Sequence, residues 1–248
     1  MLQHSEVDFD RELSETLAGC NVSALRHTYE DQDCFLVLED FLPKRILETL
    51  LSDLERARSR SHRSYIPGQK KGGSVGRHAL SALDCRFGEL YGSPAFRGLL
   101  EAITGEHLEE CPSDDLHACA LYCYTEPGDH IGWHFDTSFY RGRRFTILLG
   151  LVENASCQLE CELFRRDPER ESIFQSHTLK PGTLVLFDGD RLWHRVTPLA
   201  SGDSERFALT MEYVTDPTMS PLRRLISKVK DASAYFGWKA VFRGARRS

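Results

Sequence analysis

The sequence lacks a long uninterrupted apolar run, which argues against a chain that crosses a membrane. No stretch approaches the roughly 18 apolar residues that a spanning helix needs. Residues 1–10 are polar and acidic, unlike a secretory signal. A basic excess is also missing: the net charge is -6, which argues against a nucleic-acid partner. We therefore expect a cytoplasmic protein with no membrane partner and no nucleic-acid partner.

Internal repeats and low-complexity segments are also missing, and 248 residues with 41% hydrophobic content predict one globular domain, 1–248. Eight cysteines in a chain of this kind predict reduced thiols. Cys119 with Cys123, and Cys157 with Cys161, are spaced at i, i+4 in strand-like segments. This spacing is wider than that of usual structural zinc sites, so we interpret these cysteines as small buried hydrophobic residues.

The order of elements predicts an α+β fold, because helical patterns come first and strand patterns later. An N-terminal helical part, 1–116, precedes a β-sandwich or barrel core, 117–216, and a C-terminal helix with an aromatic tail, 217–248. Ser, Gly, Lys and Arg dominate residues 59–76, which predicts a loop that is either disordered or a lid over a site. The expected helices are 10–18, 43–58, 94–104 and 221–232. The expected strands are 34–38, 118–124, 145–152, 158–164, 172–177, 183–187 and 207–214.

A metal site is predicted by three side chains. In an extended segment, His134 and Asp136 point the same way, and His194 follows sixty residues later. Two histidines and one carboxylate form the facial triad of non-haem Fe(II) oxygenases and leave coordination positions open for a 2-oxo acid and dioxygen. Arg206 opens a later strand and suits the far carboxylate of the oxo acid. Thr210 shares its strand face and offers a further hydroxyl.

With this spacing, the sequence resembles the Fe(II)/2-oxoglutarate-dependent dioxygenase superfamily, in particular its prolyl-hydroxylase-like members, over residues 117–216. The segment from Tyr122 to Gly128 is similar to their first core strand. The resemblance implies a double-stranded β-helix (jelly-roll, cupin-like) core flanked by helices. It also implies Fe(II), 2-oxoglutarate and O2 as cofactors and co-substrate, with Tyr122 and Tyr124 lining the oxoglutarate pocket.

A narrower resemblance is carried by the run from His130 to Asp136, by the following Tyr140 to Thr146, and by the aromatic tail Tyr235–Trp238. These segments look like a group of halogenases and hydroxylases that act on lysine and related free amino acids. Halogenating members have Gly at the metal carboxylate position, where chloride binds. Asp136 at that position implies hydroxylation. Thr137 and Met211 do not match the substrate contacts of the group.

The resulting hypothesis is hydroxylation of an unactivated C–H bond of a small molecule, a free amino acid or a derivative, with release of succinate and CO2. Arg77, His130 and Trp238 are candidate substrate contacts. Each also has a structural reading, as a solvated charge, a turn residue and an anchor of the tail. A protein hydroxylase, a nucleic-acid demethylase, a desaturase or lyase, and a non-enzymatic metal-binding barrel remain alternatives. The sequence leaves the oligomeric state open.

Overall fold

The computed structural model describes residues 7–153 and 156–237 of the chain. The helices over these residues are α1 Phe9–Ala18, α2 Val22–Asp31, α3 Lys44–Arg58, α4 Arg77–Ala82, α5 Phe87–Gly92, α6 Pro94–Thr104 and α7 Pro221–Ala234. The strands are β1 Phe35–Leu38, β2 His62–Ile66, β3 Lys70–Val75, β4 Glu109–Glu110, β5 Cys119–Tyr124, β6 His130–His134, β7 Arg144–Val152, β8 Leu159–Leu163, β9 Ile173–His177, β10 Leu184–Asp188, β11 Trp193–Val196 and β12 Arg206–Val214.

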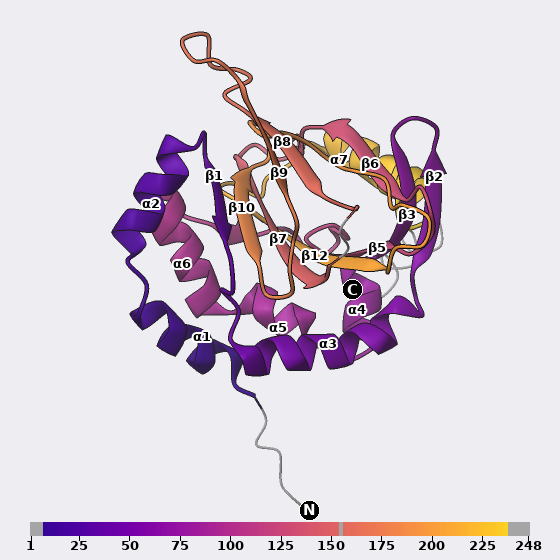
Figure 1. The fold of residues 1–248 in the computed structure, drawn as a ribbon, viewed down its shortest axis with the longest axis horizontal. Coiled ribbons are helices and arrows are strands. Elements are labelled where there is room, and N and C mark those ends of the chain that lie inside the picture. The colour runs from indigo at the N-terminus through magenta and orange to yellow at the C-terminus, as the bar shows by residue number, and fades with distance from the viewer. Residues whose placement is uncertain (1–6, 154–155, 238–248) are drawn as a thin grey trace, which may run out of the picture.

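The strands form one curled antiparallel sheet, in the order β1-β10-β7-β12-β5-β3-β6-β11-β8-β9 (Figure 1). Its two halves face each other, as in a double-stranded β-helix, and this confirms the predicted jelly-roll core in an α+β chain. The β8–β9 hairpin extends away from the body. The predicted helices near the N-terminus, before the core and after it are present as α1, α3, α6 and α7.

The N-terminal helices pack against the outer face of the larger half of the sheet, below and beside it in Figure 1. Helix α6 illustrates why they form. Ser93 accepts a hydrogen bond from the Phe96 N–H at 3.1 Å, Pro94 occupies the first turn, and Gly105 ends the helix at φ 72°. Its buried side chains, spaced three to four residues apart, face the sheet. The main core therefore lies between helices and sheet.

Strand periodicity separates this core from the interior of the curled sheet. On β7, Ile147 and Leu149 belong to the core beneath the helices, whereas Thr146 and Leu148 point to the opposite face. Because the inward positions carry polar as well as apolar side chains, the interior of the curled sheet can hold a site rather than a second solid core.

The segment 59–76 is not a loop, contrary to the prediction. It forms the β2–β3 hairpin, and β3 lies between β5 and β6 in the sheet. The prediction failed because this strand has polar residues and glycines in place of alternating apolar ones. Glycine at position 73 allows close packing, because a Cβ there would lie 2.2 Å from Ser61 Oγ and 3.3 Å from Cys123 Cβ.

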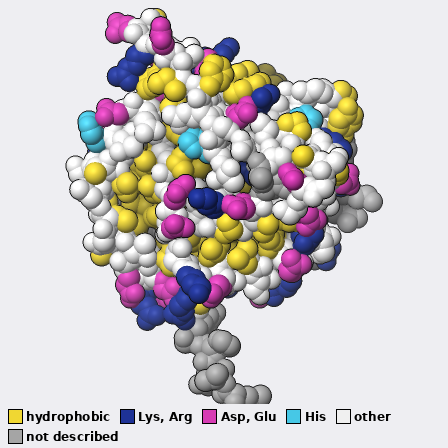
Figure 2. All heavy atoms as spheres, in the orientation of Figure 1, with side chains coloured by type: hydrophobic (Ala, Val, Ile, Leu, Met, Phe, Trp, Pro, Cys, Tyr) yellow, Lys and Arg dark blue, Asp and Glu magenta, His cyan; other side chains and the backbone are white. Residues whose placement is uncertain are grey.

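The surface charges and the state of the cysteines are as expected from the sequence. Acidic and basic side chains are intermingled on the face shown in Figure 2. All eight cysteines are free thiols, and both i, i+4 pairs are buried, as predicted. Within residues 7–153 and 156–237, none of the helices has the length and apolar character needed to cross a membrane.

Candidate metal centre

A cavity of about 760 Å³, including its open mouth, occupies the interior of the curled sheet. This volume is in the range of small-molecule sites. All three predicted metal ligands line it, as do all four predicted oxoglutarate contacts. The lining residues are His117, Tyr122, Tyr124, Ile131, His134, Phe135, Asp136, Thr137, Arg144, Leu148, Leu159, His194, Val196, Arg206, Ala208, Thr210, Glu212, Lys230 and Tyr235.

Strand register brings the two histidines together. Strands β6 and β11 are antiparallel neighbours, and His194 is the direct partner of His134. The register shifts before the next pair, Val196 with Ile131, so β6 bulges by one residue. Gly132 lies within this bulge and donates its N–H to the Gln69 carbonyl at 2.6 Å. The bulge explains why Ile131 and His134, three residues apart, both face the cavity.

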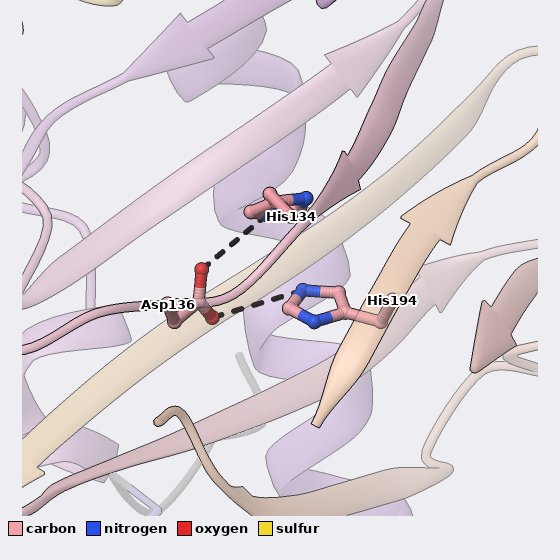
Figure 3. A group of neighbouring side chains, drawn as sticks. All are labelled: His134, Asp136 and His194. Atoms are coloured by element: carbon pink, nitrogen blue, oxygen red, sulfur yellow. Dashed lines mark ion pairs between the residues drawn. The ribbon is translucent and has the colours of Figure 1, made fainter. Parts of the chain in front are cut away.

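The three ligand atoms converge on one point (Figure 3). Nε2 of His134 lies 3.3 Å from Oδ1 of Asp136, and Nε2 of His194 lies 3.8 Å from Oδ2. All three ligand atoms are within 4.8 Å of one another. Each histidine Nδ1 lies against a backbone carbonyl, Gly132 at 2.8 Å and Leu192 at 3.1 Å. This contact places the proton on Nδ1 and leaves Nε2 free to bind a metal.

The carboxylate is held in place by its surroundings. The Thr146 hydroxyl donates a hydrogen bond to Asp136 Oδ2 at 3.0 Å. The turn after β10 packs directly against Asp136, because a Cβ at Gly189 would lie 2.7 Å from the Asp136 carbonyl oxygen. A fixed carboxylate between two imidazoles has the donor set and the preorganisation of an Fe(II) facial triad, so the residues fit that metal.

The pKa shifts describe the same site before a cation is bound. Burial alone would raise the pKa of Asp136, but the two imidazoles outweigh it, and the pKa falls well below its usual range. Burial and the neighbouring His134 lower the pKa of His194 to about 4. Burial alone would lower the pKa of His134, but the hydrogen bond to Asp136 and its charge raise it. Asp136 and His194 therefore already have the protonation state that metal ligands need, whereas a bound cation would displace the proton of His134.

One end of the cavity is built for a carboxylate. Arg206 is 2% exposed, and its Nη1 has no hydrogen-bond partner among the described residues. Its guanidinium lies 4.9 Å from the centre of the Tyr124 ring. Leaving a buried charged donor unpaired is costly, so a ligand anion is expected here. Thr210 and Tyr122 lie further along the cavity wall.

The other end of the cavity carries charged residues that the sequence analysis missed. Arg144 forms an ion pair with Glu212, and both line the cavity together with Lys230. His117 also lines the cavity, and its Nε2 lies 2.9 Å from Asp231 Oδ1. A signal was present in the sequence: Arg144 and Glu212 occupy inward positions at a period of two in otherwise apolar strands.

A second group of metal-ligand types, Cys111, Asp115 and Glu212, lies beside this charged end. Its carboxylates already have partners. Glu212 is paired with Arg144, and the Tyr140 hydroxyl donates to Asp115 Oδ2 at 2.6 Å. We interpret the group as a buried polar network that supports Arg144.

Of the three predicted substrate contacts, two are described by the structure, and neither lines the cavity. Arg77 points elsewhere: it pairs with Glu110 at 3.0 Å. His130, the first residue of β6, is not among the residues that line the cavity, and its Nδ1 lies 2.7 Å from the Gly128 carbonyl in the preceding turn. Trp238 lies outside the described residues. The tail does contribute Tyr235, which lines the cavity and lies 4.5 Å from the His117 ring, centre to centre.

Two protein-family models match the chain. The 2OG-Fe(II) oxygenase superfamily model matches residues 119–213, which include all three predicted metal ligands and Arg206. The Halogenase D model matches residues 18–141, half of the chain. No curated protein matches significantly.

Solved structures with this fold include several 2-oxoglutarate enzymes. The non-haem α-ketoglutarate-dependent epimerase SnoN of nogalamycin biosynthesis aligns with a TM-score of 0.61 and 16% identity, covering 77% of this chain and 81% of SnoN. A prolyl hydroxylase from Trichoplax adhaerens, solved with a hypoxia inducible factor peptide, aligns with a TM-score of 0.60 and 16% identity. The alignment covers 90% of this chain and 98% of the prolyl hydroxylase. AviO1 from Streptomyces viridochromogenes aligns with a TM-score of 0.60 and 17% identity, covering 81% of this chain and 97% of AviO1. At these identities the likeness shows the shared fold.

Proposed function

Because this chain belongs to the 2OG-Fe(II) oxygenase superfamily and to its Halogenase D group, we propose that it hydroxylates a free amino acid or a derivative of one. It is an enzyme that uses Fe(II), 2-oxoglutarate and O2. When bound, these supply the oxidation of an unactivated C–H bond while 2-oxoglutarate is converted to succinate and CO2.

One observation carries the proposal: the predicted ligand triad shares one cavity with a buried guanidinium, that of Arg206, whose Nη1 has no hydrogen-bond partner among the described residues. His134, Asp136 and His194 would hold the metal on one side. Arg206 would bind the distal carboxylate of 2-oxoglutarate and so orient the molecule toward the triad. The protein's own contribution is thus to position both groups and to keep them from bulk water.

Hydroxylation is favoured over halogenation by Asp136. In the halogenating members of the group that the sequence resembles, Gly at this position leaves room for chloride. Here the carboxylate fills it and is anchored by the Thr146 hydroxyl. The likeness to the Halogenase D model therefore supports a shared scaffold, while the side chain at this position supports a hydroxylase.

Strand geometry separates the two ends of the cavity. Arg206, Ala208, Thr210 and Glu212 alternate along β12 and all line it. At about 3.3 Å per residue, Arg206 and Glu212 lie about 20 Å apart along the strand. A five-carbon oxo acid bound at Arg206 does not span this distance. The end near Glu212 would therefore receive the substrate.

Charges of both signs at that end suit an amino acid. Glu212 offers a carboxylate to an ammonium group, while Arg144 and Lys230 offer cations to a carboxylate. His117 and Tyr235 close the wall beside them. A zwitterion can exchange partners with a buried ion pair without leaving either charge unpaired, whereas an apolar substrate cannot.

The first test measures binding of 2-oxoglutarate without oxygen. Addition of Fe(II) and then 2-oxoglutarate to the protein should give the weak visible charge-transfer band of the chelate. Arg206→Met should require about 100-fold more 2-oxoglutarate, because a buried charged contact is lost. Arg195→Met is the matched control, since Arg195 is not among the residues that line the cavity and its side chain pairs with Glu160 at 2.6 Å. Absence of the band in iron-loaded wild type would refute the co-substrate site.

A second test addresses the substrate. Succinate release in air should rise with one amino acid from a panel, and Glu212→Gln should lose this stimulation while the band remains. Stimulation by peptides or oligonucleotides in place of amino acids would reject the proposed substrate but keep the oxygenase chemistry.

A further inference from the structure

Helix α7 exposes an apolar stripe. Four of the seven large hydrophobic side chains that are exposed among the described residues lie on this helix. Their positions i, i+3, i+4 and i+7 place them on one face. This α7 stripe consists of Leu222 (68% exposed), Leu225 (56%), Ile226 (49%) and Val229 (42%).

The polar side of the helix faces the protein. Asp231 Oδ1 lies 2.9 Å from His117 Nε2, and Lys228 Nζ lies 3.0 Å from Asp114 Oδ2. An ordinary surface helix buries its apolar stripe and exposes its polar side. Here the arrangement is reversed, which leaves a contiguous apolar surface in water and indicates that something else covers it.

The charge around the stripe is basic. Arg223 is exposed and lies along one edge of the stripe; Lys230 lies two turns further along the same edge, where its side chain reaches the cavity. Residues 221–248 contain eight Lys and Arg and one Asp, a net charge of +7. Because the whole chain carries -6, the remainder carries -13. Positive charge is therefore concentrated in this C-terminal part.

We propose that the α7 stripe docks on an anionic lipid surface. An amphipathic helix with aliphatic residues on one side and Lys and Arg beside them binds in the plane of a membrane interface. The sequence beyond α7 has the same composition, with Trp238 and Phe242 among four cations.

Two other occupants fit less well. Antiparallel pairing of two copies of α7 would bring Arg223 of one copy beside Lys230 of the other, so like charges would flank the seam between the helices. A protein with a helix-binding groove needs access to more than one side of the helix. The contacts of Asp231 and Lys228 pin the inner side of α7 to the body. A flat anionic surface needs the exposed side alone.

Docking would place the enzyme's cavity beside the lipid. Lys230 belongs to α7 and also lines the cavity, and Tyr235 follows the helix into the cavity wall. The charged end of the cavity would then lie next to the lipid surface.

The test is co-sedimentation of the full chain with phosphatidylcholine vesicles, with and without about 30% phosphatidylglycerol. We expect binding to the anionic vesicles, reversed at about 0.5 M salt. Leu225→Ser should weaken binding about tenfold, since its half-exposed side chain no longer enters the interface. Arg223→Gln should weaken it about fivefold.

Matched controls are Ile173→Ser, an exposed aliphatic residue on the β8–β9 hairpin, and Arg60→Gln, an exposed arginine; both should bind as wild type. The oxoglutarate–iron band reports that each variant is folded. No binding to anionic vesicles, equal binding to neutral ones, or equal losses in the controls would overturn the proposal. A wild-type dimer that Leu225→Ser dissociates would overturn it too, by showing that the stripe is a self-interface.

Discussion

Lys70 provides a sharp test of the energetics of this fold. Its side chain is 2% exposed, and its Nζ has no hydrogen-bond partner among the described residues. The amine lies 3.8 Å from the centre of the Tyr235 ring and 5.3 Å from that of Tyr122. Burial lowers the pKa of Lys70 from 10.5 to about 7. We predict that Lys70→Met stabilises the protein.

The magnitude follows from proton linkage. The unfolded chain binds a proton on Lys70 up to pH 10.5, whereas the folded protein releases it above about pH 7. Between these values the unfolded state binds more protons, so the wild type gains stability as pH rises. At pH 7 the penalty is about 4 kcal/mol, and it vanishes near pH 10.5. Methionine keeps the length of the side chain and its contact with the rings, without the charge.

The assay is urea unfolding of wild type and variant from pH 6 to pH 10. The stability difference should be largest at and below pH 7 and should shrink by about 1.4 kcal/mol per pH unit above it. Lys71→Met is the control: this neighbour is one-third exposed and donates to the Pro127 carbonyl at 2.7 Å. A Lys70→Met difference that does not change with pH, or a net loss of stability, would refute the reasoning.

Two further predictions concern other buried contacts. Thr146→Val should weaken Fe(II) binding about tenfold, because Asp136 loses the hydrogen-bond donor that orients it. Anaerobic competition with a chelator measures the Fe(II) affinity. Thr183→Val, at another buried threonine, is the control, and equal weakening in this control would contradict the prediction. Asp129→Asn should destabilise the fold by about 3 kcal/mol at pH 7, because this 0% exposed carboxylate accepts two hydrogen bonds from Arg63. Burial raises the pKa of Asp129, but Arg63 and two backbone N–H groups lower it below 3.8 overall. Its stabilising contribution is therefore present above pH 4 and is lost as pH falls further. A urea-unfolding difference that stays constant from pH 3 to pH 7 would contradict this account.

The sequence by itself was enough to predict the set of metal ligands, whose side chains the structure brings together. His134 and Asp136 are two residues apart, so the extended backbone alone turns both toward one point, and ligand types define the metal class. The period-two pattern of β12 likewise places Arg206 and Thr210 on one face before any tertiary contact is known. Helices α3 and α6 were predictable because their apolar spacing and caps are local signals.

The tertiary structure decided what local signals cannot encode. The opposition of His194 and His134 depends on pairing across sixty residues and on a bulge in β6. The glycine-rich β2–β3 hairpin is a strand pair because its neighbours supply hydrogen bonds and close packing, in place of its own apolar pattern.

The charged end of the cavity and the reversed orientation of α7 have the same origin. Arg144 and Glu212 come from strands that pair only in the folded sheet, and the pocket they line exists only there. The periodicity of α7 defines an apolar stripe, but ion pairs from other elements fix which side faces water. Local periodicity sets the faces of an element, whereas long-range contacts set the direction in which each face points.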